Sequence, residues 1–378
     1  MQKKIIIISS GHPSMDERIF WKFGLSLSGN GYKVQITTSV EELHIVKENI
    51  TINSFDGLNI TKREKINRFF NIINEFDADL IICCEPLPIL AAHKFRKIKR
   101  SCKIIYDITE WYPYRSHYKL YKGFRRISIY IRQYLFNIYA TNLADHLIIG
   151  EELKANRYRI WAPFIKKTII GYYPPQKYFK FNHSIPRTDK ICFCYCGHFT
   201  EERGFKRVIS VLSEFADIFT DRKINLLLIG SFINDGVEKW FREMMIPENL
   251  KIKFKGYTNY DTYSELLSDA DVCIDLRTNR GMLDNSLPIK IFDYMAAGKP
   301  VIYSRLSSLK TIEEIETFGF LIDPYNVNEI LKVMSEYLNN TELRIDHSDN
   351  ARKLFEQKYN WEILSEKLLK IIGVFLNK

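Results

Sequence analysis

The feature that most constrains the fold is a regular alternation between short apolar runs rich in β-branched residues and longer stretches with helical periodicity. Six such runs occur in the first half of the chain, at residues 3–9, 32–38, 79–85, 103–109, 146–150 and 167–173. Their hydrophobicity is continuous rather than alternating, as expected for strands covered on both faces. The pattern predicts an α/β fold in which helices wrap a parallel, doubly wound sheet.

The pattern stops at residues 174–190, which hold three prolines and show no helical period, and we interpret this stretch as an interdomain connection. A second set of strands is predicted at 190–196, 223–230, 252–257, 271–277, 300–304 and 319–323. We expect Rossmann-like domains at 1–176 and 190–357, and a C-terminal helix at 358–378 that packs back on the first domain. Tandem sheets of this kind bind ligands at the carboxyl ends of their strands, so we expect an interdomain site.

The charge and hydropathy of the chain indicate its kind of partner and its location. A net charge of +10 and a pI near 9.0 indicate an anionic partner, which could be a nucleotide, a phospholipid surface or a nucleic acid. Nucleic acid is disfavoured because the basic residues are spread over both halves without an aromatic-basic motif. No apolar run approaches the roughly 18–20 residues that span a bilayer, and the expected location is the cytoplasm.

The seven cysteines do not form a recognisable metal site. Cys192, Cys194 and Cys196 alternate along one predicted strand, so their side chains share one face of the sheet. Residues two apart on a strand cannot converge tetrahedrally on a metal, and no CxxC or nearby pair of histidines completes a site. We therefore predict that these thiols lie in the core.

The most informative stretch is 285–302, NSLPIKIFDYMAAGKPVI. A loop there leads into a helix that is predicted to start near Pro288 and to end at Gly298 before a buried strand. Free backbone amides in the first turn would form an anion site suited to a diphosphate. Asp293 is then expected about one and a half turns into this helix.

This stretch resembles family 4 of the GT-B glycosyltransferases, in which two acids separated by seven residues precede a Gly-x-Pro-Val ending. Asn285, Asp293 and the sequence AAGKPVI occupy those positions. The resemblance implies that Asp293 accepts hydrogen bonds from the ribose of a nucleotide donor. It also places the following residues against the donor sugar and its phosphates: Asn285, Ser286, Leu287 and Pro288. Asn285 departs from the pattern, because an amide carries no charge to stabilise an oxocarbenium-like centre.

A purely structural reading of the same stretch stays open. Asp293 and Lys290 stand three residues apart on the predicted helix and can pair. The AAG sequence would then serve helix packing and capping.

A second stretch, YCGHFTEERGFKRVISVL at 195–212, resembles the diphosphate clamp of the same family. Gly197 forms the turn, His198 replaces the usual Arg, and Arg203 replaces the usual Lys. Cations placed here would stabilise the charge that gathers on the departing nucleotide diphosphate. By the same resemblance Gly256 and Tyr257 flank the base of the nucleotide. The alternative is a solvated basic helix face, with His198 as a structural group.

The first half carries the residues expected on the acceptor side. Residues 9–34 join the first strand to a helix through a turn at Gly11 and resemble the family's donor-phosphate and acceptor loop, which places Gly11 among the donor-binding residues because its backbone could approach the ligand. Residues 107–113 resemble the family's Asp-x-His-Glu segment, with Thr109 in place of the His. His12, Asp16 and Glu110 are the polar groups expected to contact the acceptor, and none has the spacing of a general base.

Residues 118–140 combine basic and aromatic side chains at helical spacing. The basic residues are Lys119, Lys122, Arg125, Arg126 and Arg132. Such a helix could lie on an anionic membrane surface. An ordinary helix that covers the domain and has a basic rim is the alternative.

Together these features predict a retaining, hexosyltransferase-type glycosyltransferase of class EC 2.4. It would move a sugar from a nucleotide diphosphate donor to a glycan or lipid-linked glycan in polysaccharide biosynthesis, with Arg203, Asn285 and Asp293 as the catalytic residues. Asp269 and Asp271 could be mistaken for a metal-binding Asp-x-Asp motif, but they stand at a predicted helix-to-strand junction. GT-B enzymes of this kind generally need no metal, so the resemblance implies no metal and no cofactor beyond the donor substrate. The alternatives are a nucleotide-sugar epimerase and a non-catalytic relative that binds a nucleotide sugar or a partner enzyme.

Overall fold

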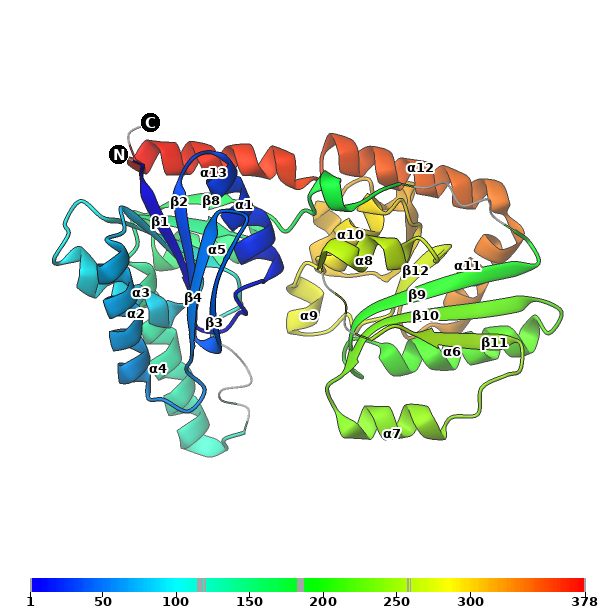
Figure 1. Cartoon of the computed structure of the whole chain (residues 1–378). Coiled ribbons are helices and arrows are strands. Elements are labelled where there is room, and N and C mark those ends of the chain that lie inside the picture. The colour runs from blue at the N-terminus through cyan, green and yellow to red at the C-terminus, as the bar shows by residue number, and fades with distance from the viewer. Residues whose placement is uncertain are drawn as a thin grey trace. The chain divides into compact units, whose positions relative to one another are not determined.

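The computed structural model describes residues 2–113, 118, 120–181, 187–256, 258 and 260–376. The chain divides into two compact units, which are coloured along the sequence in Figure 1. Unit 1 comprises Met1–Tyr172 and Ile363–Lys378, and unit 2 comprises Tyr173–Glu362. Each unit is a sheet covered by helices.

Unit 1 contains an eight-stranded sheet with the order β3-β4-β2-β1-β5-β6-β7-β8. Its strands are β1 (Lys4–Ser9), β2 (Lys33–Thr38), β3 (Val40–Lys47), β4 (Ile50–Asp56), β5 (Leu80–Cys83), β6 (Lys103–Ile108), β7 (His146–Ile149) and β8 (Lys166–Ile169). All neighbours are parallel except β3 and β4, which pair antiparallel at the edge. The six predicted strands are confirmed. The β3–β4 hairpin was missed, because β3 is largely exposed and rich in charged residues.

The helices of unit 1 follow the strands as predicted, with one irregular start. The helices are η1 (Glu17–Gly24, a π-helix), α1 (Leu25–Gly29), α2 (Lys62–Phe76), α3 (Pro86–Arg96), α4 (Gly123–Thr141) and α5 (Glu152–Trp161), and α13 (Trp361–Leu376) ends in this unit. One core lies between the sheet and α2, α3 and α5. The ring of Phe375 on α13 lies 5.9 Å from that of His146 on β7.

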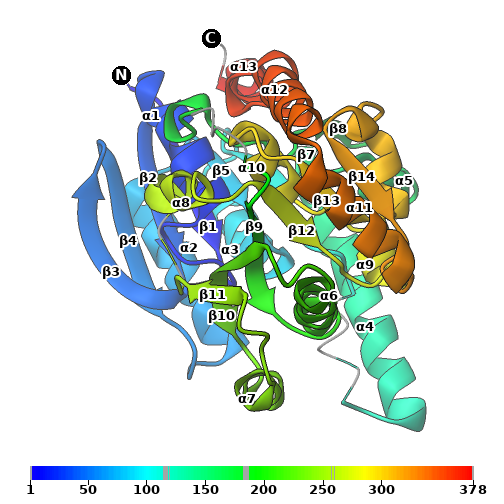
Figure 2. The same ribbon diagram turned by 90° about the vertical axis from the view of Figure 1, so that its right-hand side faces the viewer.

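Unit 2 contains six parallel strands in the order β11-β10-β9-β12-β13-β14, which can be followed in Figure 2. They are β9 (Lys190–Phe199), β10 (Lys223–Phe232), β11 (Leu250–Phe254), β12 (Val272–Asp275), β13 (Val301–Ser304) and β14 (Gly319–Ile322). The helices are α6 (Phe205–Ile218), α7 (Asp235–Glu243), α8 (Tyr260–Leu267), α9 (Met282–Asn285), α10 (Lys290–Ala296), α11 (Val327–Asn339) and α12 (Thr341–Gln357), and three 3₁₀ turns lie at Gln176–Tyr178, Ser307–Thr311 and Ile315–Thr317. All six predicted strands are confirmed.

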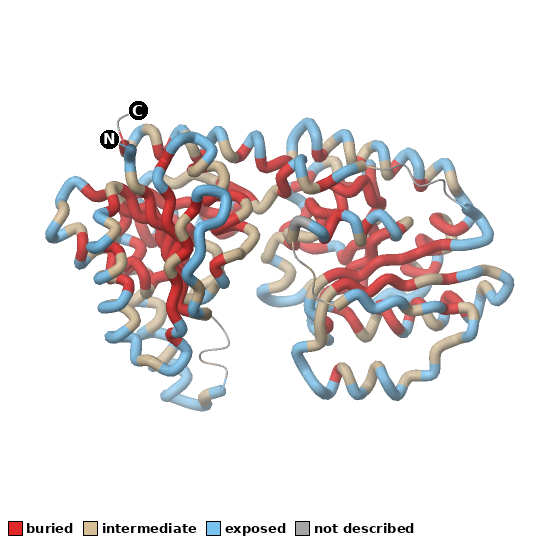
Figure 3. Tube along the Cα trace, viewed as in Figure 1, coloured by how far each residue is buried: buried red, intermediate tan, exposed pale blue. Residues whose placement is uncertain are grey.

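Alternate residues of β9 serve two cores on opposite faces of the unit 2 sheet. Ile191, Phe193 and Tyr195 pack with α6 and α11. Cys192, Cys194 and Cys196 pack with α8, α10 and α12, and Figure 3 shows the strand buried between these layers. The three thiols are therefore core residues, as predicted, and all seven cysteines are buried and unbridged.

The proline-rich stretch that was interpreted as a connection is packed against unit 2. The Pro174 carbonyl accepts a hydrogen bond from the Trp361 amide (3.0 Å), and the Phe179 carbonyl accepts one from Arg352 (2.7 Å). Residues 182–186 lie outside the described part of the chain. The chain passes between the units at Tyr172–Tyr173 and again at Glu362–Ile363, which differs from the predicted limits of 1–176, 190–357 and 358–378.

Two features of the described residues concern membranes and metals. None of the helices described is long and apolar enough to cross a membrane. No group of three or more His, Cys, Asp or Glu side chains in the described segments is arranged to hold a metal ion.

Candidate functional site

Two glycines lie near the carboxyl ends of β9 and β10, two residues before each strand ends. Gly197 and Gly230 are register partners, and both have positive φ (121° and 145°). A Cβ on Gly230 would lie 1.9 Å from the Gly197 carbonyl oxygen, so only glycine fits this close approach. Neither strand carries a side chain at this position, close to the edge where parallel sheets bind ligands.

Arg203 and His198 both border this glycine edge, as predicted. A Cβ on Gly197 would lie 3.9 Å from Nη1 of Arg203. The Tyr195 hydroxyl holds their loop by donating to the carbonyls of Arg203 (3.0 Å) and His198 (3.4 Å). Both residues are exposed, and within the described residues the Arg203 guanidinium forms no ion pair.

His198 is the weaker of the two as a cation. Partial burial and the neighbouring charges of Arg203 and Lys290 lower its pKa below the usual value. The imidazole is therefore neutral near pH 7 and can offer a hydrogen bond but not a full charge.

Lys290 is a third basic residue of this cluster, and its functional value was missed from the sequence. It is the first residue of α10, and its Nζ lies 3.4 Å from Oδ2 of Asp293 and 4.4 Å from the ring centre of Tyr263. Its charge also acts on His198. The sequence offered one indication, a lysine just after Pro288 in the predicted anion-binding turn, but we considered it only as a partner of Asp293.

Asp293 is almost fully buried (1 % exposed), whereas the Lys290 side chain is 30 % exposed. The predicted Asp293–Lys290 pair is present. The pair does not exclude a ribose contact, which remains a prediction. It means that any ligand of Asp293 has to share the carboxylate with Lys290.

The turn before α10 differs from the prediction. The helix begins at Lys290 and has only seven residues. The amides of Ile291 and Phe292 already donate to the carbonyls of Pro288 (3.2 Å) and Ile289 (3.1 Å), and Pro288 has no N–H. The expected cradle of free amides is therefore smaller than predicted.

The glycine that follows α10 fits the structural alternative, in which the AAG sequence serves helix packing and capping. Gly298 has φ 61° and its amide donates to the Met295 carbonyl (3.0 Å). A Cβ there would meet the Phe181 ring at 2.3 Å. Gly298 therefore caps the helix and allows close packing.

Asn285 ends the short helix α9 and is exposed, and its side-chain amide donates to the Gly281 carbonyl (3.2 Å). The neighbouring acid, Asp284, accepts hydrogen bonds from the amide (2.9 Å) and hydroxyl (2.7 Å) of Ser307. The Ser286 carbonyl accepts another from Ser308 (3.2 Å). The loop that carries Asn285 and Leu287 is thus fastened, and Asn285 itself remains open to solvent.

Of the two residues predicted to flank the nucleotide base, only Gly256 lies in the described part of the chain. Gly256 has φ 62°, its carbonyl accepts a hydrogen bond from the Gly230 amide (2.9 Å), and no atom lies within 4 Å of where its Cβ would be. Tyr257 lies outside the described residues.

In unit 1 the structure brings the predicted acceptor residues together. His12 Nδ1 lies 3.4 Å from Oδ2 of Asp16, and His12 Nε2 lies 3.4 Å from Oγ1 of Thr109. Glu110 follows Thr109 and acts electrostatically on His12. These residues come from the loops after β1 and β6, at the carboxyl edge of the sheet.

Glu85 is the residue of this cluster that we missed. It follows β5, is buried, and accepts hydrogen bonds from the Ser9 hydroxyl (2.7 Å) and the Ser10 amide (2.6 Å). Its Oε1 lies 3.6 Å from His12 Nε2. An acid at the end of a predicted buried strand, in DLIICCE, was the available indication.

Gly11 lies in the bend that follows β1, without a positive φ. A Cβ on it would lie 3.3 Å from Glu85 Oε1. The residue therefore allows close packing against Glu85, and its contact with the donor stays a prediction.

Charges in this cluster shift its pKa values strongly. Burial opposes the imidazolium of His12, but the hydrogen bond and charge of Asp16 with the charges of Glu85 and Glu110 outweigh it and raise the pKa to about 9. Burial raises the pKa of Glu85, against the effect of His12. Burial also acts on Asp16, where the His12 contact and the amides of Arg18 and Ile19 reverse it and lower the pKa. His12 is therefore charged at neutral pH.

Buried ion pairs support both strand-end clusters. Arg18 of η1 pairs with Asp107 of β6 through two bonds (2.6 and 2.7 Å) and donates to the carbonyls of residues 170 and 171. In unit 2, Arg277 pairs with Asp275, which also accepts a hydrogen bond from Tyr303 (2.7 Å). Both pairs are buried and serve the scaffold.

Unit 2, which carries the cluster of Arg203, Lys290 and Asp293, contains a segment that is similar to a known protein family. Residues 176–354 match the family model described as glycosyl transferases group 1. The match covers a little under half of the chain and makes this segment similar to the group 1 glycosyl transferases. Arg203, Lys290 and Asp293 all lie within it.

The curated proteins that this chain resembles are distant in sequence. The chain is 24% identical over 187 residues to an uncharacterized glycosyltransferase of Methanocaldococcus jannaschii (49% of this chain, 45% of the relative). It is 27% identical over 175 residues to the chitobiosyldiphosphodolichol beta-mannosyltransferase of Debaryomyces hansenii (43% and 36%). The chain thus spans less than half the length of these relatives.

The fold of the chain resembles solved structures over its whole length. Sucrose-phosphate synthase from Thermosynechococcus elongatus matches with a TM-score of 0.77 at 15% identity, covering 100% of both chains. The predicted GT-B fold with two Rossmann-like parallel-sheet domains is confirmed. At this identity the likeness concerns the fold alone.

Proposed function

We propose that the chain transfers a hexosyl group from a nucleotide diphosphate sugar to a hydroxyl of a glycan or lipid-linked glycan, a reaction of class EC 2.4. The observation that carries the proposal is the cluster of Arg203, Lys290 and Asp293 around the glycine edge of unit 2, inside the segment that matches the group 1 model.

In this proposal Arg203 and Lys290 bind the diphosphate. As the bond between the anomeric carbon and the diphosphate oxygen breaks, negative charge grows on the leaving group, and fixed cations beside it lower the barrier. Arg203 is exposed and forms no ion pair within the described residues, so it is available to a phosphate. His198, neutral near pH 7, would add a hydrogen bond.

Asp293 and Asn285 are assigned to the nucleoside and sugar ends of the donor. An Asp293 carboxylate held by Lys290 can still accept hydrogen bonds from ribose hydroxyls through its other lone pairs. Asn285 is exposed and can bond sugar hydroxyls, but it cannot stabilise a positive centre by charge. Ser286, Leu287 and Pro288 would line the same donor region.

The acceptor is assigned to unit 1, at His12, Asp16 and Glu110. The hydroxyl oxygen of the acceptor forms the new bond to the anomeric carbon, and its proton leaves with the nucleoside diphosphate, so no separate base is required. Retention of the anomeric configuration follows from this step in family 4. The relative from Debaryomyces hansenii is named as a beta-mannosyltransferase, so the product anomer should be measured by proton NMR.

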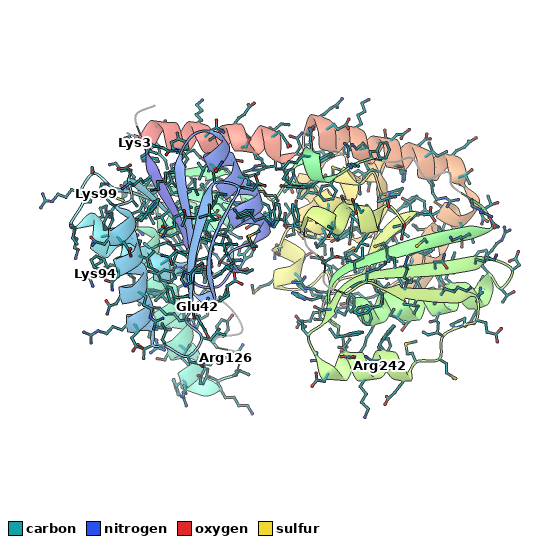
Figure 4. All side chains as sticks on the ribbon, viewed as in Figure 1. Lys3, Glu42, Lys94, Lys99, Arg126 and Arg242 are labelled. Atoms are coloured by element: carbon teal, nitrogen blue, oxygen red, sulfur yellow. The ribbon has the colours of Figure 1, made fainter. Side chains whose placement is uncertain are left out.

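We further propose that α4 rests on an anionic membrane that carries a lipid-linked acceptor. Phe124 is 91 % exposed, and Ile127, Ile131 and Leu135 continue the exposed apolar face at helical spacing. Basic residues flank this face: Arg125, Arg126, which is labelled in Figure 4, and Arg132. Lys119 lies outside the described residues. In a sedimentation assay the chain should be found in the pellet with vesicles that contain anionic lipid. The double variant Phe124→Ser with Ile131→Ser should stay in the supernatant.

The donor proposal is tested by thermal shift against UDP-, GDP-, ADP-, CMP- and dTDP-sugars, with and without EDTA. One nucleotide sugar should raise the melting temperature by mass action, and EDTA should leave the shift intact if no metal is needed. Lys290→Gln and Asp293→Asn should abolish the shift, whereas Lys239→Gln on the exposed helix α7 should keep it. If no nucleotide sugar stabilises the wild type, the donor site assigned here is wrong.

A further inference from the structure

His12 is held between carboxylates that come from different elements of unit 1. Asp16, in the same loop, faces Nδ1 at 3.4 Å. Glu85, at the end of β5, faces Nε2 at 3.6 Å. Thr109, at the end of β6, lies 3.4 Å from the same nitrogen. The imidazole therefore has a fixed position at the carboxyl edge of the sheet.

Glu85 also fixes the loop that carries His12. Its two oxygens accept hydrogen bonds from the Ser9 hydroxyl (2.7 Å) and the Ser10 amide (2.6 Å). The Ser9 hydroxyl oxygen in turn accepts a hydrogen bond from the His12 amide (2.9 Å). Gly11 packs against Glu85, where a Cβ would lie 3.3 Å from Oε1. One buried acid thus organises four consecutive residues.

The contacts of Nε2 are long for hydrogen bonds, at 3.4 and 3.6 Å. The His12 side chain is 25 % exposed. An N–H that is poorly satisfied by the protein and reachable from solvent can turn to a ligand oxygen without losing a strong bond. On the Nδ1 side Asp16 lies at 3.4 Å, and its negative charge favours the imidazolium.

The charges around His12 indicate which oxygen it would bind. Five acids, Asp16, Glu85, Asp107, Glu110 and Glu151, lie in this cluster with three basic groups, His12, Arg18 and Lys154. Even with Glu85 protonated, the acids outnumber the bases. A phosphate or carboxylate would be repelled here, whereas a sugar hydroxyl would not.

We propose that Glu85 is a positioning residue that holds His12 as a charged hydrogen-bond donor, and that His12 binds a hydroxyl oxygen of a neutral sugar. This rests on the proposed function only in naming that sugar as the acceptor. The recognition of a neutral hydroxyl in unit 1 does not depend on donor binding in unit 2.

The test follows the imidazole resonances of the full chain, labelled at its eight histidines, by NMR as pH is raised. His12→Gln assigns the signal. In wild type the His12 signal should titrate near pH 9, and Glu85→Gln should lower that midpoint by at least about one pH unit. Glu42→Gln is the matched control, because Glu42 lies beside His44 (3.7 Å) and is labelled in Figure 4; it should leave the His12 midpoint unchanged.

Ligand addition completes the test. Methyl glucoside should shift the wild-type His12 signal at lower concentration than glucose 6-phosphate, and the shift should weaken at least tenfold in Glu85→Gln. A midpoint that Glu85→Gln does not move overturns the positioning role. A shift with the phosphate alone, or with neither sugar, overturns the hydroxyl-binding role. Neither readout uses transfer activity, so a failure here is distinct from failure of the donor site.

Discussion

At the scale of single residues, the account depends most on Arg203. The side chain is exposed beside Gly197 and forms no ion pair in the described part of the chain. Arg203→Ala removes a charge-assisted hydrogen bond worth about 1.5–3 kcal/mol, so affinity for a nucleoside diphosphate should fall about 10- to 100-fold. Isothermal titration calorimetry measures this loss.

Arg242 provides the control for Arg203. It is an exposed arginine on α7 of the same unit, paired with Glu238 at 2.6 Å and labelled in Figure 4. Arg242→Ala should leave affinity for the nucleoside diphosphate unchanged. Equal losses in both variants would mean that only the general positive field binds the ligand.

His12 gives a pH dependence of stability. Its pKa in the folded chain is about 9, against an ordinary value of 6.5. A raised pKa stabilises the folded state fully below pH 6.5, and this contribution is lost as pH rises through 9. The difference in free energy of unfolding between wild type and His12→Gln should therefore shrink from about pH 6 to about pH 9.5. Urea denaturation measures it, and a difference that grows with pH contradicts the assigned charge.

At the scale of elements, the glycine edge of β9 and β10 is the least replaceable feature. Gly230→Ala puts a Cβ 1.9 Å from the Gly197 carbonyl at a φ of 145°. Backbone strain of this kind costs about 1–3 kcal/mol, and the clash adds to it. Gly29→Ala is the control, because no atom lies within 4 Å of its Cβ position. Chemical denaturation should show the loss in Gly230→Ala alone.

The same elements show what the sequence could predict. Most of the twelve predicted strands are continuous apolar runs buried on both faces, whereas the edge strands β8 and β11 are partly exposed. The β3–β4 hairpin escaped because an exposed edge strand carries charged residues and lacks that pattern. Asp293, Arg203 and His198 were predicted as site residues because they stand in a recognisable motif, and their roles stay predictions.

Residues whose role depends on folding could not be predicted in the same way. Lys290 becomes part of a basic cluster only when the start of α10 lies beside the end of β9. Glu85 acquires its role when β5 lies next to β1 and brings the acid to the Ser9–His12 loop. Gly11 likewise packs against Glu85, a contact between residues 74 positions apart in the sequence. The predicted interdomain position of the site stays a prediction.

At the scale of the whole molecule, the chain leaves unit 1 at Tyr172 and returns to it at Ile363. The returning segment buries Leu364, Leu368, Ile372 and Leu376. Burying each such side chain contributes about 1.5–3 kcal/mol. The two units should therefore respond differently to loss of the C-terminus.

Deletion of residues 363–378 should destabilise unit 1 and spare unit 2. A loss of about 6 kcal/mol or more corresponds to a fall of more than about 10 °C in the melting temperature of unit 1. Differential scanning calorimetry should then resolve a low transition for unit 1 and an unshifted one for unit 2. A parallel fall of both transitions would contradict this division of the chain.

The central claim is that the chain moves a sugar from a nucleotide donor through the Arg203 cluster. The most direct measurement incubates it with each nucleotide sugar and a lipid extract of its host membrane, and follows nucleoside diphosphate release together with the mass of glycosylated product. The account predicts that one donor yields both, that Arg203→Ala abolishes both, and that Arg242→Ala retains them. A donor that binds but is never cleaved, or cleavage that survives Arg203→Ala, would contradict it.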